Sequence, residues 1–314
     1  MKLLVNVAMI INQSSKIGDI VKIKLFDSFV EIKDITCGMN GNPGLPYTDT
    51  RLNLYTCLSH VCNTNCPFCI YNYKDDEPFD FEKWKVCVTE IVKTTGIFKA
   101  SFTGGEPSLD IERLVKCLDY LKSVDSKIFT KINTNGSNLD KLKGIKSLDN
   151  IALSRHSMRD DENFELFGNK NVPTKDIIAN FPEKEKLHLS CNLVRGYVDS
   201  FDKIIDYLEE CSKLGVRDVG FVALMPVNDF AREHQIDLSD IPISVSNRFI
   251  INQYFDRIVE DKCVCKCRNY MYLANNGNVV TAYSRYFVDR NYSDGTLVFM
   301  DNKLKQGFTG SVIN

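Results

Sequence analysis

The sequence lacks the features that would place it in a membrane or on a nucleic acid. No segment approaches the ~20 uninterrupted apolar residues of a membrane-spanning helix. The 39 basic and 41 acidic residues leave a net charge of −2, so no overall field attracts nucleic acid. The apolar start at residues 1–11 lacks the small-residue cleavage site of a secretory leader, and we expect an opening β-strand there. We predict a cytoplasmic protein with no membrane or nucleic-acid partner.

The composition, with 44% hydrophobic and 25% charged residues, is that of a globular protein. From residue 52 to about residue 226, short apolar runs alternate with longer amphipathic stretches, which is typical of repeated β-α units around a parallel sheet. We expect strands near residues 52–57, 99–103, 128–133, 150–154, 186–192 and 218–224. We expect helices at residues 81–93, 111–122 and 201–214. The prediction is an α/β fold, a partial (β/α)6 barrel of the TIM-like kind.

Two further parts flank this barrel in the predicted organisation. Residues 1–50 form an N-terminal β extension with a ribbon at 19–35, and residues 51–240 form the barrel. Residues 241–314 begin with a helix at 248–259, followed by a Cys-rich turn. A small β-hairpin follows at residues 270–283, because Asn276-Gly277 is a strong signal for a tight hairpin turn.

Cysteine is unusually frequent, with 12 residues. A long chain without an export signal does not need a disulfide framework, so metal or redox chemistry is the better explanation. We expect buried thiols at Cys37, Cys57, Cys87, Cys117, Cys191 and Cys211. The remaining cysteines fall into two clusters, Cys62, Cys66, Cys69 and Cys263, Cys265, Cys267.

The first cluster places three thiols in one loop after the first barrel strand. Thiolates select zinc, copper(I) or iron-sulfur clusters. A cubane cluster has four irons, so three cysteines leave one iron without a protein ligand. The alternative is a structural zinc site, with His60 or a distant cysteine as the fourth ligand.

The second barrel strand ends in Thr103-Gly104-Gly105-Glu106-Pro107. The two glycines allow the backbone to approach a ligand closely, and Glu106 places a carboxylate at the C-terminal edge of the sheet. The three-cysteine loop followed by Gly-Gly-Glu-Pro resembles the radical S-adenosylmethionine (radical SAM) superfamily. The resemblance extends over residues 54–224.

The resemblance implies a 4Fe–4S cluster, S-adenosylmethionine and a set of residues that hold them. Cys62, Cys66 and Cys69 match the cluster ligands, Phe68 the position against the adenine, and Gly104, Gly105 and Glu106 the segment that holds the methionine amino group. Asn133 and Asn135 match a third-strand motif, while Ser154, Asn192 and Arg195 match positions that reach the ribose and the carboxylate. Asn, Ser and Arg are also common as caps and loop residues at strand ends, and that reading stays open for these positions.

The resemblance also implies the reaction. Members of the superfamily bind S-adenosylmethionine on the open iron, and one electron from the reduced cluster gives a 5′-deoxyadenosyl radical that abstracts hydrogen. The electron donor would be a protein such as flavodoxin or ferredoxin. We predict a small-molecule substrate, because the first fifty residues are too short and too strand-like for a peptide-leader module. The alternatives are a maturase or epimerase of a ribosomally made peptide, and a non-catalytic zinc or iron-sulfur protein.

The second cluster, Cys263, Cys265 and Cys267, resembles the short auxiliary-cluster domain (twitch- or SPASM-like) of some members, including the molybdenum-cofactor cyclases. We predict an auxiliary iron-sulfur cluster there. Its fourth ligand is open, because residues 280–285 contain no cysteine. A zinc site or a hydrogen-donating thiol is the alternative. The His156 segment, with Arg155 and Arg159, is expected to be a solvated charged loop.

Overall fold

The computed structural model describes residues 21–32, 51–69, 77–236, 241, 249–251, 268–285, 295–308 and 310–314. The strands are β1 (Val21–Leu25), β2 (Ser28–Ile32), β3 (Leu52–Cys57), β4 (Ile97–Thr103), β5 (Phe129–Thr134), β6 (Asn150–Ser154), β7 (Leu187–Leu193), β8 (Asp218–Ala223), β9 (Phe249–Ile251), β10 (Arg268–Leu273), β11 (Val279–Arg285), β12 (Thr296–Met300) and β13 (Lys303–Gln306). The α-helices are α1 (Phe81–Thr94), α2 (Ile111–Val124), α3 (Asp160–Phe167), α4 (Lys175–Ala179), α5 (Phe201–Leu214) and α6 (Asp229–Glu233).

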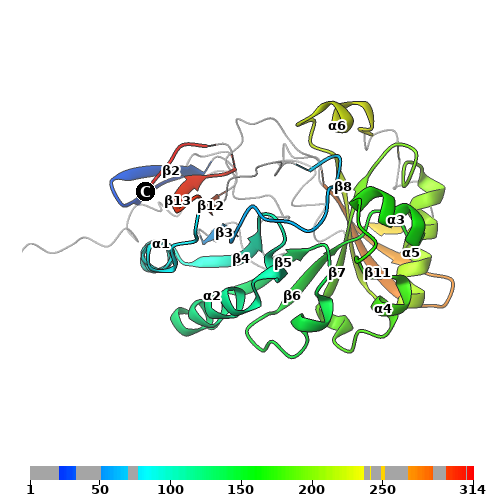
Figure 1. The fold of residues 1–314 in the computed structure, drawn as a ribbon, viewed down its shortest axis with the longest axis horizontal. Helices are drawn as coiled ribbons and strands as arrows, with labels where there is room; N and C mark the ends of the chain where they lie inside the picture. Colours follow the sequence, from blue (N-terminus) through cyan, green and yellow to red (C-terminus); the bar gives the residue numbers. More distant parts are fainter. Residues whose placement is uncertain are drawn as a thin grey trace, which may run out of the picture.

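One large sheet organises the described residues, in the order β13-β12-β3-β4-β5-β6-β7-β8-β11-β10-β9. Strands β3 to β8 pair in parallel, and β12 and β11 extend the parallel arrangement on either side. Figure 1 shows the sheet curving, with α1, α2 and α5 along its outer side. The predicted α/β architecture with a partial TIM-like barrel is confirmed, and no strand pairing closes the barrel within the described part of the chain.

The helices form where apolar residues recur on one face and where a polar side chain caps the first turn. In α1, Asp80 accepts a hydrogen bond from the backbone N–H of Lys83 at 3.0 Å, and Trp84, Val88 and Ile91 are buried against the sheet. The α5 helix ends at Gly215, whose φ of 78° is the left-handed conformation common at helix ends. These faces and the sheet form one apolar core, which fixes the positions of the strand ends.

The segments outside the predicted barrel core also pair as strands. β1 and β2 form the expected N-terminal ribbon, and β10 and β11 form the expected hairpin around Asn276-Gly277. Because β11 pairs with β8, the hairpin continues the main sheet. The predicted boundaries at residues 50 and 240 remain predictions.

One helix prediction is wrong at its start. Phe249–Ile251, placed in a helix at 248–259, form β9 and pair with β10, so pairing at the sheet edge overrides the local helical pattern. The rest of that segment, the opening strand at residues 1–11 and Cys263, Cys265 and Cys267 lie outside the described residues. No described helix has both the length and the apolar character to span a membrane.

Candidate active site

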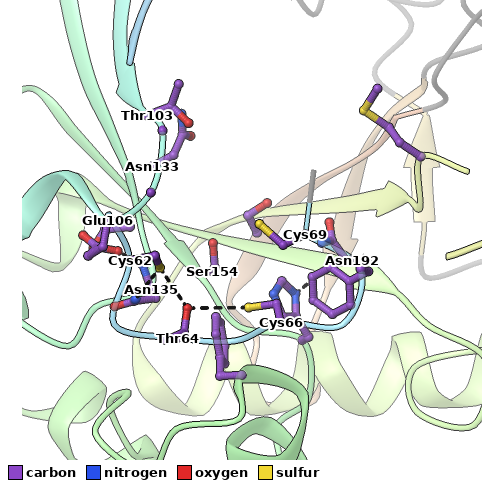
Figure 2. A pocket seen from close by; sticks show the side chains of 18 of the residues that line it. Cys62, Thr64, Cys66, Cys69, Thr103, Glu106, Asn133, Asn135, Ser154 and Asn192 are labelled. Carbon is purple, nitrogen blue, oxygen red and sulfur yellow. Dashed lines mark hydrogen bonds between the residues drawn. The ribbon is translucent and has the colours of Figure 1, made fainter. Parts of the chain in front are cut away.

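A cavity of about 280 Å³ opens at the C-terminal ends of β4 to β8. The predicted residues that line it are Cys62, Cys66, Phe68, Cys69, Gly104, Gly105, Glu106, Asn133, Asn135, Ser154 and Asn192. Figure 2 shows Glu106 and Asn135 on the Cys62 side, and Asn192 on the side of Cys66 and Cys69. The fold therefore brings residues from five separate segments to one cavity, at the edge of the sheet where parallel folds place ligands.

The cysteine loop turns its three thiols toward this cavity. The backbone N–H of Cys69 donates to the carbonyl of Cys66 at 3.1 Å, and the Thr64 hydroxyl lies 3.1 Å from Cys62 Sγ and 3.7 Å from Cys66 Sγ (Figure 2). Burial raises the pKa of the Cys66 thiol to about 12; the Thr64 hydrogen bond opposes this shift, and Cys69 and Cys62 add to it. Only a strongly attracting cation or cluster would deprotonate this thiol near neutral pH.

These thiols are the donor set that a cubane cluster with one open iron requires, because each cysteine of a cubane binds a different iron. A zinc site would instead need four ligands around one ion. Within the described residues, no group of three or more His, Cys, Asp or Glu side chains is placed to hold a single metal ion. His60, the suggested fourth zinc ligand, instead lies with Nε2 2.6 Å from Asp301 Oδ1, outside the cavity lining.

The Gly104-Gly105-Glu106 segment packs directly against the cysteine loop. The N–H groups of Gly105 and Glu106 donate to the carbonyls of Ser59 and Val61, each at 2.8 Å. A Cβ atom on Gly104 would lie 2.4 Å from the Ser59 oxygen, and one on Gly105 would lie 2.0 Å from the Val61 oxygen. The crowding neighbour of both glycines is thus the cysteine loop, and the expected approach of this backbone to a ligand remains a prediction.

Glu106 connects the ends of β4 and β5 from a buried position. Its side chain, in a residue that is 3% exposed, accepts hydrogen bonds from the Thr134 hydroxyl at 2.6 Å and from the N–H groups of Ser108 and Asn135 at 2.9 and 2.7 Å. The Asn135 amide in turn donates to Asn63 Oδ1 at 2.8 Å, within the cysteine loop. A carboxylate has about four acceptor sites, so Glu106 retains capacity for a ligand donor.

Arg195 differs from the other predicted site residues. Its side chain is exposed, donates to the carbonyl of Gln235 at 3.2 Å, and does not line the cavity. The role predicted for it at the cofactor remains a prediction.

His156 is a cavity residue that the sequence analysis missed. The expected solvated loop is wrong at this point, because Arg155 and His156 are 1% and 3% exposed. The His156 ring lies 4.9 Å from the Phe167 ring in a stacked arrangement and meets Phe68 edge-on at 5.0 Å. Burial, together with the Arg155 guanidinium, lowers the pKa of His156 to about 3. Its position two residues after the β6 end, at the ligand-binding edge, is the signal that could have revealed it.

Comparison with known proteins identifies the class to which this fold and cavity belong. Residues 56–238 match the model of the radical SAM superfamily, and the chain belongs to that superfamily. It is thus an enzyme of a group whose cofactors are a 4Fe–4S cluster and S-adenosylmethionine.

More specific relatives match only part of their own length. The chain is 28% identical over 197 residues to a probable GTP 3′,8-cyclase of Saccharolobus islandicus, covering 59% of each protein. It is 25% identical over 187 residues to an uncharacterised protein of Methanocaldococcus jannaschii, covering 57% of this chain and 64% of that protein. A structure of Streptococcus suis SuiB bound to S-adenosylmethionine matches with a TM-score of 0.57 and 18% identity, covering 84% of this chain and 63% of SuiB, which supports the fold.

Proposed function

We propose that this protein cleaves S-adenosylmethionine reductively and abstracts hydrogen from a small-molecule substrate, with its cluster held by Cys62, Cys66 and Cys69. The observation that carries the proposal is that these three thiols share one cavity with the Glu106 network. The cluster and S-adenosylmethionine together supply the 5′-deoxyadenosyl radical; the chain supplies binding and orientation.

The cavity residues divide these tasks. Glu106 offers a fixed negative charge for the methionine amino group, because three hydrogen bonds hold its carboxylate in place. Phe68 offers an aromatic face for the adenine, and Ser154 and Asn192 offer polar groups for the ribose and carboxylate. Phe167, Leu224 and Met225 form an apolar part of the wall that limits access of water.

The polar part of the cavity lining favours a small polar substrate. Asn133, Ser154 and Ser190, from β5, β6 and β7, line the cavity. The relationship to a probable GTP 3′,8-cyclase, whose name refers to a nucleotide, also supports a small molecule.

Peptide modification is the second candidate. A structure of SuiB bound to its precursor peptide SuiA matches this chain with a TM-score of 0.50 and 22% identity, covering 68% of this chain and 46% of SuiB. A short precursor-peptide gene beside the gene for this protein would favour the peptide. We further propose a flavodoxin or ferredoxin as electron donor, a cytoplasmic location, and an auxiliary iron-sulfur cluster at Cys263, Cys265 and Cys267.

The direct test is anaerobic incubation of the reconstituted protein with S-adenosylmethionine and dithionite, with 5′-deoxyadenosine followed by mass spectrometry. Cys66→Ala should abolish 5′-deoxyadenosine formation and lower the iron content by the amount of one cluster. Cys117→Ala is the matched control, because Cys117 is a buried thiol of α2 that lies outside the cavity lining. Full 5′-deoxyadenosine formation by the Cys66 variant would show that the ligand assignment is wrong.

A further inference from the structure

His156 has one ring nitrogen occupied by the fold. The backbone N–H of Asn192 donates to His156 Nδ1 at 3.0 Å. A ring nitrogen that accepts a hydrogen bond carries no proton, so in the neutral ring the proton resides on Nε2. The hydrogen-bond network thereby selects the tautomer in which Nε2–H is a donor.

The remaining nitrogen, Nε2, is open to the cavity. Within the described residues no group forms a hydrogen bond with Nε2. It is also not one of the fully buried side-chain atoms that lack a hydrogen-bond partner, so part of its surface is accessible. Because His156 lines the cavity and is otherwise enclosed by protein, this opening leads into the cavity. A polar atom such as Nε2, which lies beside the Phe68 and Phe167 rings without a partner among the described residues, is stabilised when a ligand supplies its hydrogen-bond partner.

The orientation of this donor is fixed from several sides. Phe167 stacks on the ring and Phe68 contacts it edge-on. The backbone N–H of His156 donates to Asn163 Oδ1 at 2.9 Å, which anchors the residue after β6. Little conformational freedom is left for the ring to lose when a ligand binds, so a hydrogen bond made by Nε2 adds to affinity with a small entropic cost.

We propose that His156 Nε2–H donates a hydrogen bond to the nucleoside half of S-adenosylmethionine. The inference relies on the assignments of Glu106 and Phe68 in the proposed function. Glu106 follows β4 and would hold the methionine half, whereas His156 follows β6 and is bonded to the end of β7. Its edge contact with Phe68, the residue proposed to receive the adenine, places the donor at the nucleoside end of the cavity.

Two amide variants, each of which can replace one ring nitrogen of His156, separate a ligand contact from a structural role. In His156→Asn, the side-chain oxygen can replace Nδ1 as acceptor for the Asn192 N–H, but nothing replaces Nε2. In His156→Gln, the amide N–H can replace the Nε2 donor, but the Nδ1 acceptor is lost. The proposal predicts that the Asn variant binds S-adenosylmethionine about tenfold more weakly and the Gln variant within about threefold of wild type, the usual range for one neutral hydrogen bond. A structural role predicts the reverse order.

The dissociation constant is measured on the anaerobically reconstituted protein by equilibrium dialysis, with iron content and circular dichroism confirming that each variant is folded and loaded. His188→Gln is the control, since His188 is a buried histidine that does not line the cavity, and its constant should match wild type. In a second arm, 5′-deoxyadenosine and methionine serve as separate probes. Weaker binding of 5′-deoxyadenosine alone by the Asn variant supports the proposal.

Equal weakening of methionine binding, or unchanged affinity of the Asn variant for S-adenosylmethionine, would overturn the proposal. A failure of the proposed function gives a different result. In that case wild type forms no 5′-deoxyadenosine with dithionite, while the order of affinities among the His156 variants is unaffected.

Discussion

Two buried histidines use their ring nitrogens differently: His188 lies within a strand of the barrel, and His156 lies just beyond the C-terminal end of another strand. His188 of β7 has both nitrogens occupied, with Nδ1 2.9 Å from Asp218 Oδ2 and Nε2 2.9 Å from the Tyr283 hydroxyl. His156, above β6, has one nitrogen bound by the backbone and the other open to the cavity. A fully satisfied polar group stabilises the fold, whereas a half-satisfied one in a fixed orientation is prepared for a ligand. The barrel interior around His188 and Tyr283, here called the lower barrel, therefore has a structural role at this point. The C-terminal edge of the sheet around His156, here called the upper edge, is where we propose that the cofactor binds.

Two crowded glycines show the same contrast. A Cβ on Gly105 would lie 2.0 Å from the backbone oxygen of Val61, in the cysteine loop at the upper edge. A Cβ on Gly220 would lie 2.3 Å from a ring carbon of Tyr283, in the lower barrel. Both positions exclude a side chain, but only the first is in contact with the proposed cluster loop.

The largest effect in this comparison is expected from Gly105→Ala. The added methyl group must displace the Val61 carbonyl, a backbone group that also accepts the Glu106 N–H, and we expect a loss of about 3 kcal/mol in the free energy of unfolding. The cysteine loop should move with it, so the iron bound per chain should fall. Urea denaturation and iron analysis measure the two effects.

Gly220→Ala is the control for this prediction. It should also lower the free energy of unfolding, by displacing the Tyr283 ring, but the folded protein should retain its iron. Equal iron content in both variants would contradict the distinction between the upper edge and the lower barrel.

A smaller effect is expected from Glu106→Gln. Each oxygen of this carboxylate accepts a hydrogen bond from a backbone N–H, and one also accepts from the Thr134 hydroxyl. Whichever oxygen the amide nitrogen of Gln replaces, one backbone N–H therefore loses its acceptor. We expect a cost of about 2 kcal/mol in the free energy of unfolding and weaker binding of S-adenosylmethionine. Chemical denaturation and equilibrium dialysis test this. An unchanged affinity for S-adenosylmethionine, together with the loss of stability, would show that Glu106 only stabilises the loops and does not bind the cofactor.

The sequence predicted the strand ends, and with them most of the cavity, because hydrophobic alternation fixes where a strand ends and parallel strands end at one edge. Ser154 and Asn192 are examples: each was expected at the end of its strand, and both line the cavity. The glycines were expected to let the backbone approach a ligand, and that part stays a prediction. The identity of the group that crowds them, the backbone of residues 59–61, depends on tertiary contacts that no local pattern contains.

His156 could not be recognised from its neighbours, because Arg155, Arg159 and the following acidic residues have the composition of a solvated loop. The fold buries Arg155 by giving its guanidinium the carbonyls of Pro173 and Met158 and the carboxylate of Asp160 as acceptors. Because these acceptors pair with the guanidinium, Arg155 can be buried, and the adjacent His156 then lies in the cavity wall. The start of the predicted helix at residue 248 was likewise changed by pairing with β10, a distant strand.

The smallest expected effect comes from Tyr283→Phe, which makes the lower histidine resemble the upper one. The Asp218 carboxylate accepts from Nδ1–H of His188, so Nε2 accepts from the Tyr283 hydroxyl, and its removal leaves that nitrogen unpaired in a buried site. We expect a loss of about 1 kcal/mol in the free energy of unfolding, measured by urea denaturation. The dissociation constant for S-adenosylmethionine should not change, because Tyr283 and His188 lie outside the cavity lining. A matching loss of affinity would mean that the two heights of the barrel are coupled, and that a satisfied histidine below the cavity also helps to position the cofactor above it.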